Sequence, residues 1–171
     1  MVGAFVVRAV SLSAFLVLVG VLIGVMPVGS TVTGPSGRVA VVDGDTIDVG
    51  GIRVRLHGID APEVSQTCET DEGVVWACGD WVRSELEMRI EGRNAICEAH
   101  GQDRYDRVIA ICRVDGRDIA AALVRDGLAF AYRRYSLDYV ADENAASHAG
   151  RGLWDGVIQS PEAYRRAKRR G

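Results

Sequence analysis

The chain has 171 residues, of which 48% are hydrophobic, and a formal net charge of −3 at pH 7. This length suits one globular domain with a single core and a terminal extension. The charge is uneven, because residues 161–171 hold five basic residues and one acidic residue, a local +4 that leaves −7 on residues 1–160. This balance excludes a broad basic surface, so any polyanion must be held by a few placed arginines.

The pattern of the N-terminal segment is typical of a targeting sequence. Residues 9–28 are almost wholly apolar, and Arg8 is the only charged residue before Arg38. A stretch of this length can span a bilayer as a helix, and it exceeds the apolar region of a typical signal peptide. Small residues at 28–30 nevertheless offer a cleavage site. We expect residues 1–29 to be a membrane anchor with the rest of the chain outside the cytoplasm, or a signal peptide of a secreted or periplasmic protein. A buried core helix is the remaining alternative.

The rest of the chain divides by composition. Residues 30–37 are rich in Gly, Ser, Thr and Pro, which is typical of a linker. One domain is expected over residues 38–156, followed by a basic C-terminal tail, residues 157–171. Pro161 permits a short helix in this tail, but a solvated tail is the simpler expectation, and contact with phosphates or anionic lipid is the alternative.

Five short stretches have the pattern of β-strands. A Gly50-Gly51 pair separates the second from the third and indicates a tight hairpin. Alternation in the third places Arg53 and Arg55 on one face and three aliphatic residues on the other. The five predicted strands are residues 38–42, 47–49, 52–56, 94–98 and 108–114.

Three helices are predicted between and after these strands. The first covers residues 81–91 with Asp80 as its N-cap, and the second covers residues 119–126 with Asp118 as its N-cap. The third covers residues 137–149. Five short strands with about three helices give a mainly β fold, and a closed Greek-key barrel of the oligonucleotide/oligosaccharide-binding (OB) type is one of few such folds near this length.

Three polar clusters lie at predicted strand ends or in loops. They are Asp43–Thr46 in a turn, Arg55–Glu63 running off a strand, and Asp103–Arg107 closing a hairpin. Each has an unremarkable interpretation when taken alone: a turn, a capping acid, or arginines such as Arg104 that pair with neighbouring acids. Their joint occurrence is much harder to explain in this way.

Together the clusters hold the groups that phosphodiester hydrolysis needs. Asp45 and Asp60 can hold a hard cation through oxygen. Arg55 and Arg107 can bind phosphate oxygens, since a guanidinium is planar and permanently charged. Glu63 can orient or deprotonate the attacking water.

Four stretches in order, VVDGDTIDV, RVRLHGIDAPE, DRYDRVIA and ALVRDGLAFAY, resemble the signature stretches of the staphylococcal nuclease (thermonuclease) family. The resemblance covers residues 38 to about 154. It implies a five-stranded OB barrel with three helices, and calcium-dependent hydrolysis of DNA and RNA that leaves 3'-phosphate ends. The alternative is a catalytically weak OB module that binds nucleic acid or protein at the cell envelope.

The resemblance also assigns roles by position. The catalytic positions are Arg55, Glu63 and Arg107, and the Ca²⁺ ligands are Asp45, Asp60 and the main-chain carbonyl of Ala61, with Asp43 behind them. The implied partners are the DNA or RNA substrate, and a membrane if the N-terminal segment is uncleaved. A monomer is expected.

Substrate contacts are assigned to Arg104, Tyr105 and Tyr132, the tyrosines stacking on bases or serving as plain core or surface residues. A one-residue shift relative to the family leaves open whether Tyr132 or Tyr135 faces a base. The family usually has Gly at the position of Asp106, and a negative charge there predicts weaker phosphate binding.

The positions of the four cysteines fit the predicted arrangement of strands and loops. Cys97 and Cys112 lie on adjacent predicted strands and can form one bridge, while Cys68 and Cys78 can close the long loop after Glu63. Two disulfides point to an oxidising compartment. Four buried free thiols are the alternative.

Overall fold

The computed structural model describes residues 34–171, so the expected anchor or signal peptide at residues 1–29 lies outside the described residues. Among the helices of the described part, none combines the length and the apolar character that a membrane crossing requires.

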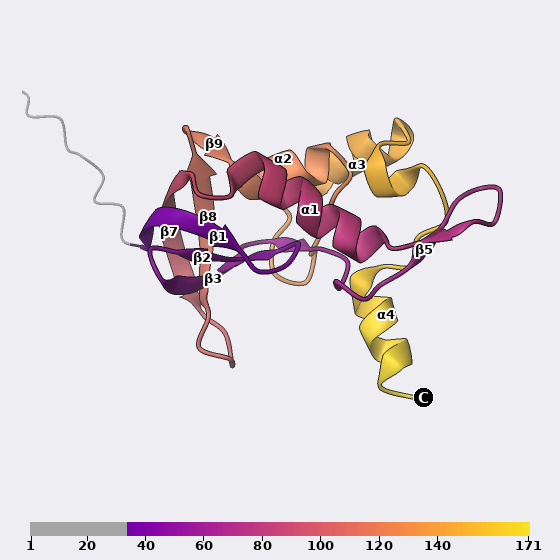
Figure 1. Ribbon diagram of the computed structural model, residues 1–171, viewed down its shortest axis with the longest axis horizontal. Coiled ribbons are helices and arrows are strands. Elements are labelled where there is room, and N and C mark those ends of the chain that lie inside the picture. Colours follow the sequence, from indigo (N-terminus) through magenta and orange to yellow (C-terminus); the bar gives the residue numbers. More distant parts are fainter. Residues whose placement is uncertain (1–33) are drawn as a thin grey trace, which may run out of the picture. The chain divides into compact units, whose positions relative to one another are not determined.

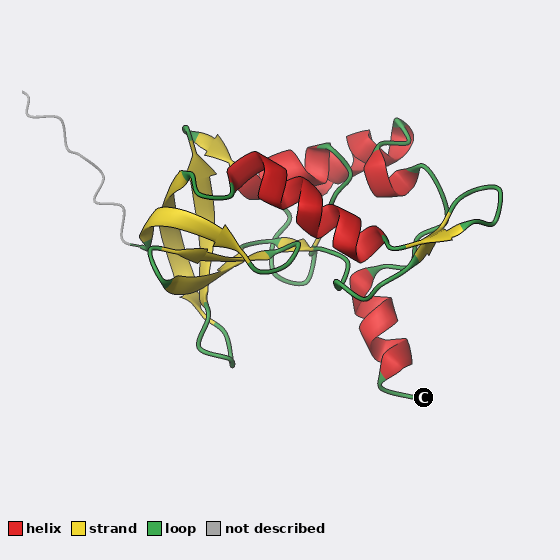
Figure 2. Ribbon diagram, viewed as in Figure 1, coloured by secondary structure: helices red, strands yellow, loops and turns green. Residues whose placement is uncertain are grey.

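The described residues build a closed five-stranded barrel (Figures 1 and 2). Its strand order is β3-β2-β1-β7-β8, and a parallel pairing of β3 with β8 closes it. This is the predicted OB-type Greek-key barrel. The strands are β1 (Ser36–Val41), β2 (Thr46–Val49), β3 (Ile52–Leu56), β7 (Asn94–Gln102) and β8 (Val108–Val114).

Three barrel strands are longer than predicted, β2 only by its first residue, Thr46. Strand β1 begins at Ser36, inside the expected linker, because residues 36–38 pair with β7. Strand β7 continues to Gln102 across an irregularity between Ala99 and Gly101, so the loop that precedes Arg107 is shorter than expected. Five two-residue strands were not predicted: β4 (Ile59–Asp60), β5 (Cys68–Glu69), β6 (Val75–Trp76), β9 (Arg117–Asp118) and β10 (Phe130–Ala131).

The three predicted helices are confirmed and a fourth is added. Asp118 caps α2 as predicted, accepting from the Ala121 amide at 3.1 Å. Helix α1 begins at Cys78, three residues early, and Asp80 lies in its first turn rather than capping it. The helices are α1 (Cys78–Ile90), α2 (Ile119–Arg125), α3 (Val140–His148) and α4 (Pro161–Lys168), with a 3₁₀ turn, η1, at Gly152–Trp154.

The core lies inside the barrel and beneath the helices that cover it. Helix α1 packs on β1, and α2 packs on β8 and α3. Barrel residues Ile47, Val54 and Leu56 and helix residues Leu86 and Leu123 are at most 1% exposed. Burial of this apolar surface is the main force that fixes the strand ends from which the polar clusters project.

Both predicted disulfides are present, and all four cysteines are paired. Cys97 and Cys112 lie directly opposite each other in the β7–β8 ladder. Cys68 is joined to Cys78, which ties β5 to the first residue of α1. Two buried bridges are typical of proteins that work outside the reducing cytoplasm.

Removing the β7–β8 bridge tests its contribution to stability. The bridge closes a loop with a sequence separation of 15 residues. The free energy of unfolding of the double variant Cys97→Ala/Cys112→Ala should therefore be lower than that of wild type by about 3 kcal/mol. Urea denaturation under non-reducing conditions measures the change. An unchanged midpoint would contradict the entropic role of this bridge.

Candidate active site

A cleft of about 1010 Å³ opens at one side of the barrel. It is bordered by the turn after β1, the loop after β4, the β7–β8 loop, the segment after β10, and α4. The three predicted catalytic residues, Arg55, Glu63 and Arg107, all line the cleft. Asp45 and Ala61 line it too, whereas Asp60 is buried beside it.

The turn between β1 and β2 fixes Asp45. The Asp43 carboxylate accepts from the Asp45 amide at 3.0 Å, and the Asp45 carbonyl accepts from the Leu56 amide at 2.9 Å. Gly44 permits close packing, since a Cβ there would lie 2.7 Å from the Ala61 Cβ. The buried Asp45 carboxylate accepts from the Ala61 amide at 3.2 Å. Asp45 is thereby held against the segment that follows Asp60.

Arg55 on β3 connects two buried carboxylates. Its guanidinium is ion-paired with Asp45 and lies 3.1 Å from Asp60 Oδ1. Burial acts to lower the pKa of Arg55, but the charges of Asp45 and Asp60 outweigh it and raise that pKa. The short β4–β10 pairing holds Asp60 in place, with Asp60 opposite Phe130.

Glu63 is positioned by the start of α1. Its carbonyl accepts from the Gln66 amide at 2.7 Å, which closes a turn. Gly79 in the first turn of α1 packs directly on this turn, because a Cβ there would lie 1.8 Å from the Glu63 carbonyl oxygen. The Cys68–Cys78 bridge joins the same two segments. The Glu63 side chain itself is partly exposed and faces the cleft.

Arg165 on α4 also enters the site. Its guanidinium lies 2.8 Å from Asp60 Oδ2 and 2.9 Å from Glu63 Oε1. Burial acts to lower the pKa of Arg165, but its hydrogen bonds to both acids raise it overall. This arrangement differs from the solvated tail expected from the sequence. Ser160 and Pro161 do signal a helix start, but only the folded chain brings residue 165 next to residues 60 and 63.

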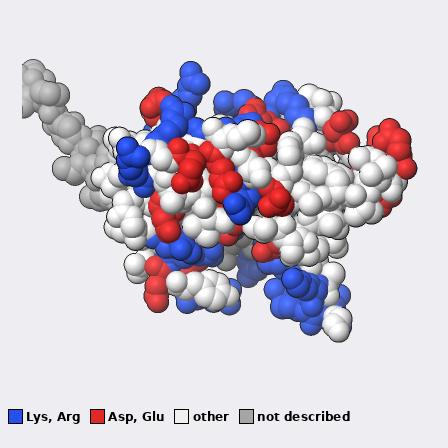
Figure 3. All heavy atoms as spheres, viewed as in Figure 1, with Lys and Arg blue, Asp and Glu red and all other residues white. Residues whose placement is uncertain are grey.

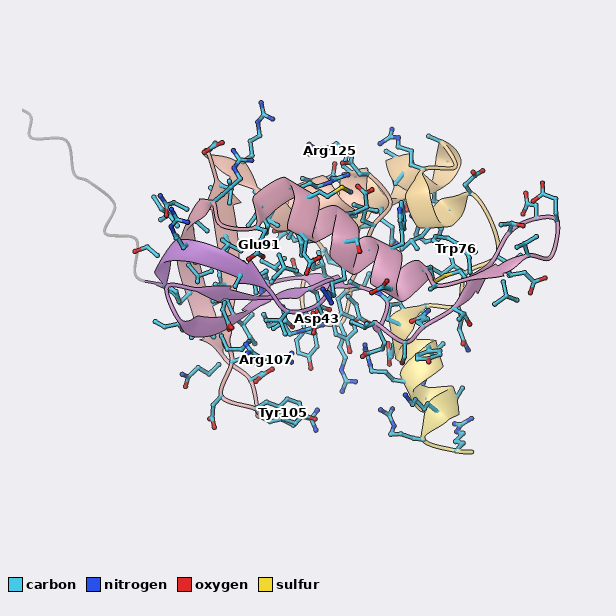
Figure 4. The ribbon with its side chains drawn as sticks, in the orientation of Figure 1. Asp43, Trp76, Glu91, Tyr105, Arg107 and Arg125 are labelled. Carbon is cyan, nitrogen blue, oxygen red and sulfur yellow. A yellow bond between two sulfur atoms is a disulfide. The ribbon has the colours of Figure 1, made fainter. Side chains whose placement is uncertain are left out.

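The last predicted catalytic residue, Arg107, lies at the end of the β7–β8 loop. Its Nε donates to Asp103 at 2.7 Å, and its Nη1 donates to the Thr46 hydroxyl at 3.2 Å. The pairing with Asp103 that the sequence left open is therefore present. Asp106 has φ of 61°, a conformation that favours glycine, which explains why Gly is suited to this position. Figure 4 shows Arg107 nearer the strands and Tyr105 near the loop tip.

The predicted substrate residues all border the cleft. Tyr105 is 70% exposed and lies beneath the guanidinium of Arg104, 5.7 Å from its Cζ. Tyr132 and Tyr135 both border the cleft. Their rings contact each other edge to face, with centroids 4.9 Å apart. Three further arginines of the cleft were not predicted, because each lies on an irregular or C-terminal segment: Arg134, Arg165 and Arg169.

The charges of the cluster leave room for a cation. Asp45, Arg55, Asp60, Arg165 and Glu63 form a continuous chain of ion pairs in that order. With Asp43 added, four carboxylates face two guanidinium groups, a net charge of −2. Burial raises the pKa of Asp60, and burial together with the charge of Asp45 raises the pKa of Asp43.

The side chains of this cluster that could bind a metal ion are all carboxylates, which bind through oxygen, and hard divalent cations prefer oxygen ligands. Asp45 and Asp60, which share Arg55 as a partner, fit two of the ligand positions. Across residues 34–171 no group of three or more His, Cys, Asp or Glu side chains is arranged around a common centre. A cation here would therefore also need main-chain, water or substrate oxygens.

The fold and the site together define a class: an OB barrel whose cleft carries arginines and carboxylates suited to phosphate chemistry. Residues 53–156 match the family described as staphylococcal nuclease homologue, and the chain belongs to this family. Arg55, Asp60, Glu63 and Arg107 lie inside the matched region. The Asp43–Asp45 turn and α4 lie outside it.

Curated relatives agree with this placement. The chain is 36% identical over 121 residues to the succinoglycan biosynthesis protein ExoI of Rhizobium meliloti. The aligned region covers 69% of this chain and 63% of that protein. It is 33% identical to an uncharacterized endonuclease of Escherichia coli, covering 73% of this chain and 80% of the relative. It is 32% identical to the micrococcal nuclease of Shigella flexneri, with coverage of 77% and 80%.

The Asp43 carboxyl gives a test of the crowded charge. Its pKa is raised above the ordinary 3.8 in the folded protein, so deprotonation destabilises the fold as pH rises through that raised value. Asp43→Asn keeps the acceptor for the Asp45 amide and removes the charge. The variant should melt a few degrees higher than wild type at pH 7 in chelator, with the gain shrinking as pH falls toward 3.8. Thermal melts across pH measure this, and a gain independent of pH would refute it.

Proposed function

We propose that the protein is a calcium-dependent endonuclease that hydrolyses phosphodiester bonds of DNA and RNA through attack by water. The observation that supports this most directly is convergence. Arg55, Glu63 and Arg107 come from three separate segments and line one cleft beside the buried pair Asp45 and Asp60. A binding module has no need for this combination of acid, arginines and buried carboxylates.

The two arginines bind the substrate phosphate. Arg55 and Arg107 line the cleft, where Arg55 is ion-paired with Asp45 and Arg107 with Asp103. When a phosphodiester enters, the guanidinium groups donate to its non-bridging oxygens and neutralise the charge that grows there in the transition state. A guanidinium hardly gives up its proton, so Arg107 acts as a charged clamp rather than as an acid.

Glu63 acts on the water. Its carboxylate accepts a proton from the attacking water, or holds that water in line with the phosphorus. As the water oxygen bonds to phosphorus, the P–O bond to the 5'-oxygen breaks, and that oxygen leaves and takes a proton from solvent. In the structure Glu63 Oε1 is occupied by Arg165 at 2.9 Å. The contact with Arg165 involves Oε1 alone, so the partly exposed carboxylate can accept from the water through Oε2.

The carboxylates of Asp45 and Asp60 and the carbonyl of Ala61 would hold Ca²⁺, with Asp43 behind them. The bound cation supplies positive charge against a phosphate oxygen. Magnesium shares the preference for oxygen, and the family resemblance favours calcium. The net charge of −2 on the surrounding cluster matches a divalent cation.

The disulfides support a domain that works outside the cytoplasm. Both bridges lie next to site segments, one beside Glu63 and one in the ladder that carries Arg107. We place the protein in an oxidising compartment, tethered by residues 1–29 or released after their cleavage. We expect it to act as a monomer on DNA and RNA substrates.

A nuclease assay with intact disulfides tests the proposal. Wild type should cleave DNA and RNA with Ca²⁺ and lose activity in chelator. Glu63→Gln should lower kcat by about 10²- to 10⁴-fold with little loss of substrate binding, because a general base contributes about that much. Glu98→Gln, an exposed glutamate on β7, is the matched control and should keep full activity. Absence of cleavage by wild type with any divalent cation would instead support the binding module.

Arg165 gives a test based on binding alone. Its guanidinium and a cation compete for Asp60, so Arg165→Gln should bind Ca²⁺ more tightly, by roughly tenfold or about 1.4 kcal/mol. Isothermal titration calorimetry without substrate measures this. Arg166→Gln is the control, because Arg166 lies 3.8 Å from Glu162 and pairs with neither site acid in the structure. Equal affinities of wild type and Arg165→Gln would show that the pairing does not oppose the cation.

A further inference from the structure

Helix α4 presents basic side chains to the cleft. Arg165 and Arg169 line the main cleft, and Lys168 joins them around an adjoining hollow of about 180 Å³ that also contains Glu63 and Ser65. Figure 3 shows Lys and Arg atoms gathered over α4, in contrast to the mixed charge elsewhere on the visible face. The helix therefore adds a basic wall directly beside the predicted catalytic acid.

The wall is held in a fixed place. The Ser160 hydroxyl accepts from the Ala163 amide at 3.3 Å and Pro161 occupies the first turn, so the helix start is well formed. Tyr164 donates to the Ser65 carbonyl at 3.1 Å, and the buried Gln66 side chain donates to the Gln159 carbonyl at 2.7 Å. An isolated eight-residue helix is unstable in water, so these contacts keep the wall in place.

The exposed basic side chains at and just after the end of α4 divide into two groups. Lys168 and Arg169 are exposed and border the hollows beside Glu63. Arg166 and Arg170 are also exposed but border neither hollow. A basic tail that served only general attraction would need no such placement, and the rest of the chain carries −7.

We propose that α4 is a second phosphate-binding surface, and that Lys168 and Arg169 hold the backbone of a single-stranded polynucleotide on the Glu63 side of the cleavage site. The proposal rests on the proposed function. A basic groove combined with aromatic side chains is the arrangement that binds single strands. The same cleft is lined by the half-buried ring of Tyr132 and the exposed ring of Tyr135. The proposed surface lies outside the part of this chain that matches the family, which ends at residue 156.

Two double variants separate this surface from general charge. Lys168→Ala/Arg169→Ala and Arg166→Ala/Arg170→Ala each remove two charges from the same segment. Each is assayed as full-length protein on a labelled 30-nucleotide single strand and on a nitrophenyl phosphodiester of thymidine, which has no further backbone phosphates for Lys168 and Arg169 to bind. Circular dichroism and thermal melts verify folding, and Arg169→Glu serves as a second, charge-reversing variant.

The cleft-side double variant, Lys168→Ala/Arg169→Ala, should raise KM for the long strand roughly tenfold. It should also reduce the slope of log(kcat/KM) against log[salt] by about 1.4, or about 0.7 per lost phosphate contact. The thymidine ester should be cut as by wild type. The Arg166→Ala/Arg170→Ala variant should change KM for the long strand far less.

Other outcomes overturn the proposal in distinguishable ways. Equal KM changes for both double variants would mean a diffuse electrostatic effect. Unchanged KM for the cleft-side variant, with lost binding to vesicles of anionic lipid, would assign α4 to a membrane surface. If wild type cuts neither substrate, the proposed function itself fails, whatever α4 does.

Discussion

The site depends on one chain of alternating charges that runs Asp45, Arg55, Asp60, Arg165, Glu63. Asp45 and Asp60 are almost completely buried, and isolated charges in such positions would be strongly disfavoured. Each guanidinium satisfies two carboxylates, so acids from the first barrel turn, β4 and the following loop can be held close together. Removing Arg55 leaves the buried Asp45 without its ion-pair partner, and removing Arg165 does the same to Glu63, so the two arginines give the cluster its defined geometry.

Much of the fold followed from local patterns. The five barrel strands, the Asp118 cap of α2 and both cysteine pairs were predicted correctly, because alternation, capping chemistry and adjacent strands are local or nearly local signals. The two-residue strands carry no period of their own and form only when the tertiary fold pairs them. The early start of α1 has a similar cause, because Cys78 and Gly79 are buried against the loop after Glu63.

The site was predicted in part. Motif positions placed Arg55, Glu63 and Arg107 around a common cleft, but their present ion-pair partners were not all foreseen. Arg165 lies about a hundred positions from its acids, and no spacing rule connects them. For the C-terminal segment, Pro161 permits a short helix and the charge favours a solvated tail. Its actual position depends on the contacts of Tyr164 with Ser65 and of Gln159 with Gln66, which no local pattern predicts.

The Cys68–Cys78 bridge has a consequence for when the cleft becomes complete. It fastens the segment after Glu63 to the first turn of α1, and Gly79 in that turn packs on the Glu63 backbone. In a reducing environment this covalent fastening is missing, and the loop from residue 64 to residue 77 is anchored by weaker contacts alone. Oxidation of this cysteine pair thus restricts the position of the Glu63 backbone, and the order of this edge of the cleft is coupled to the redox state of the chain.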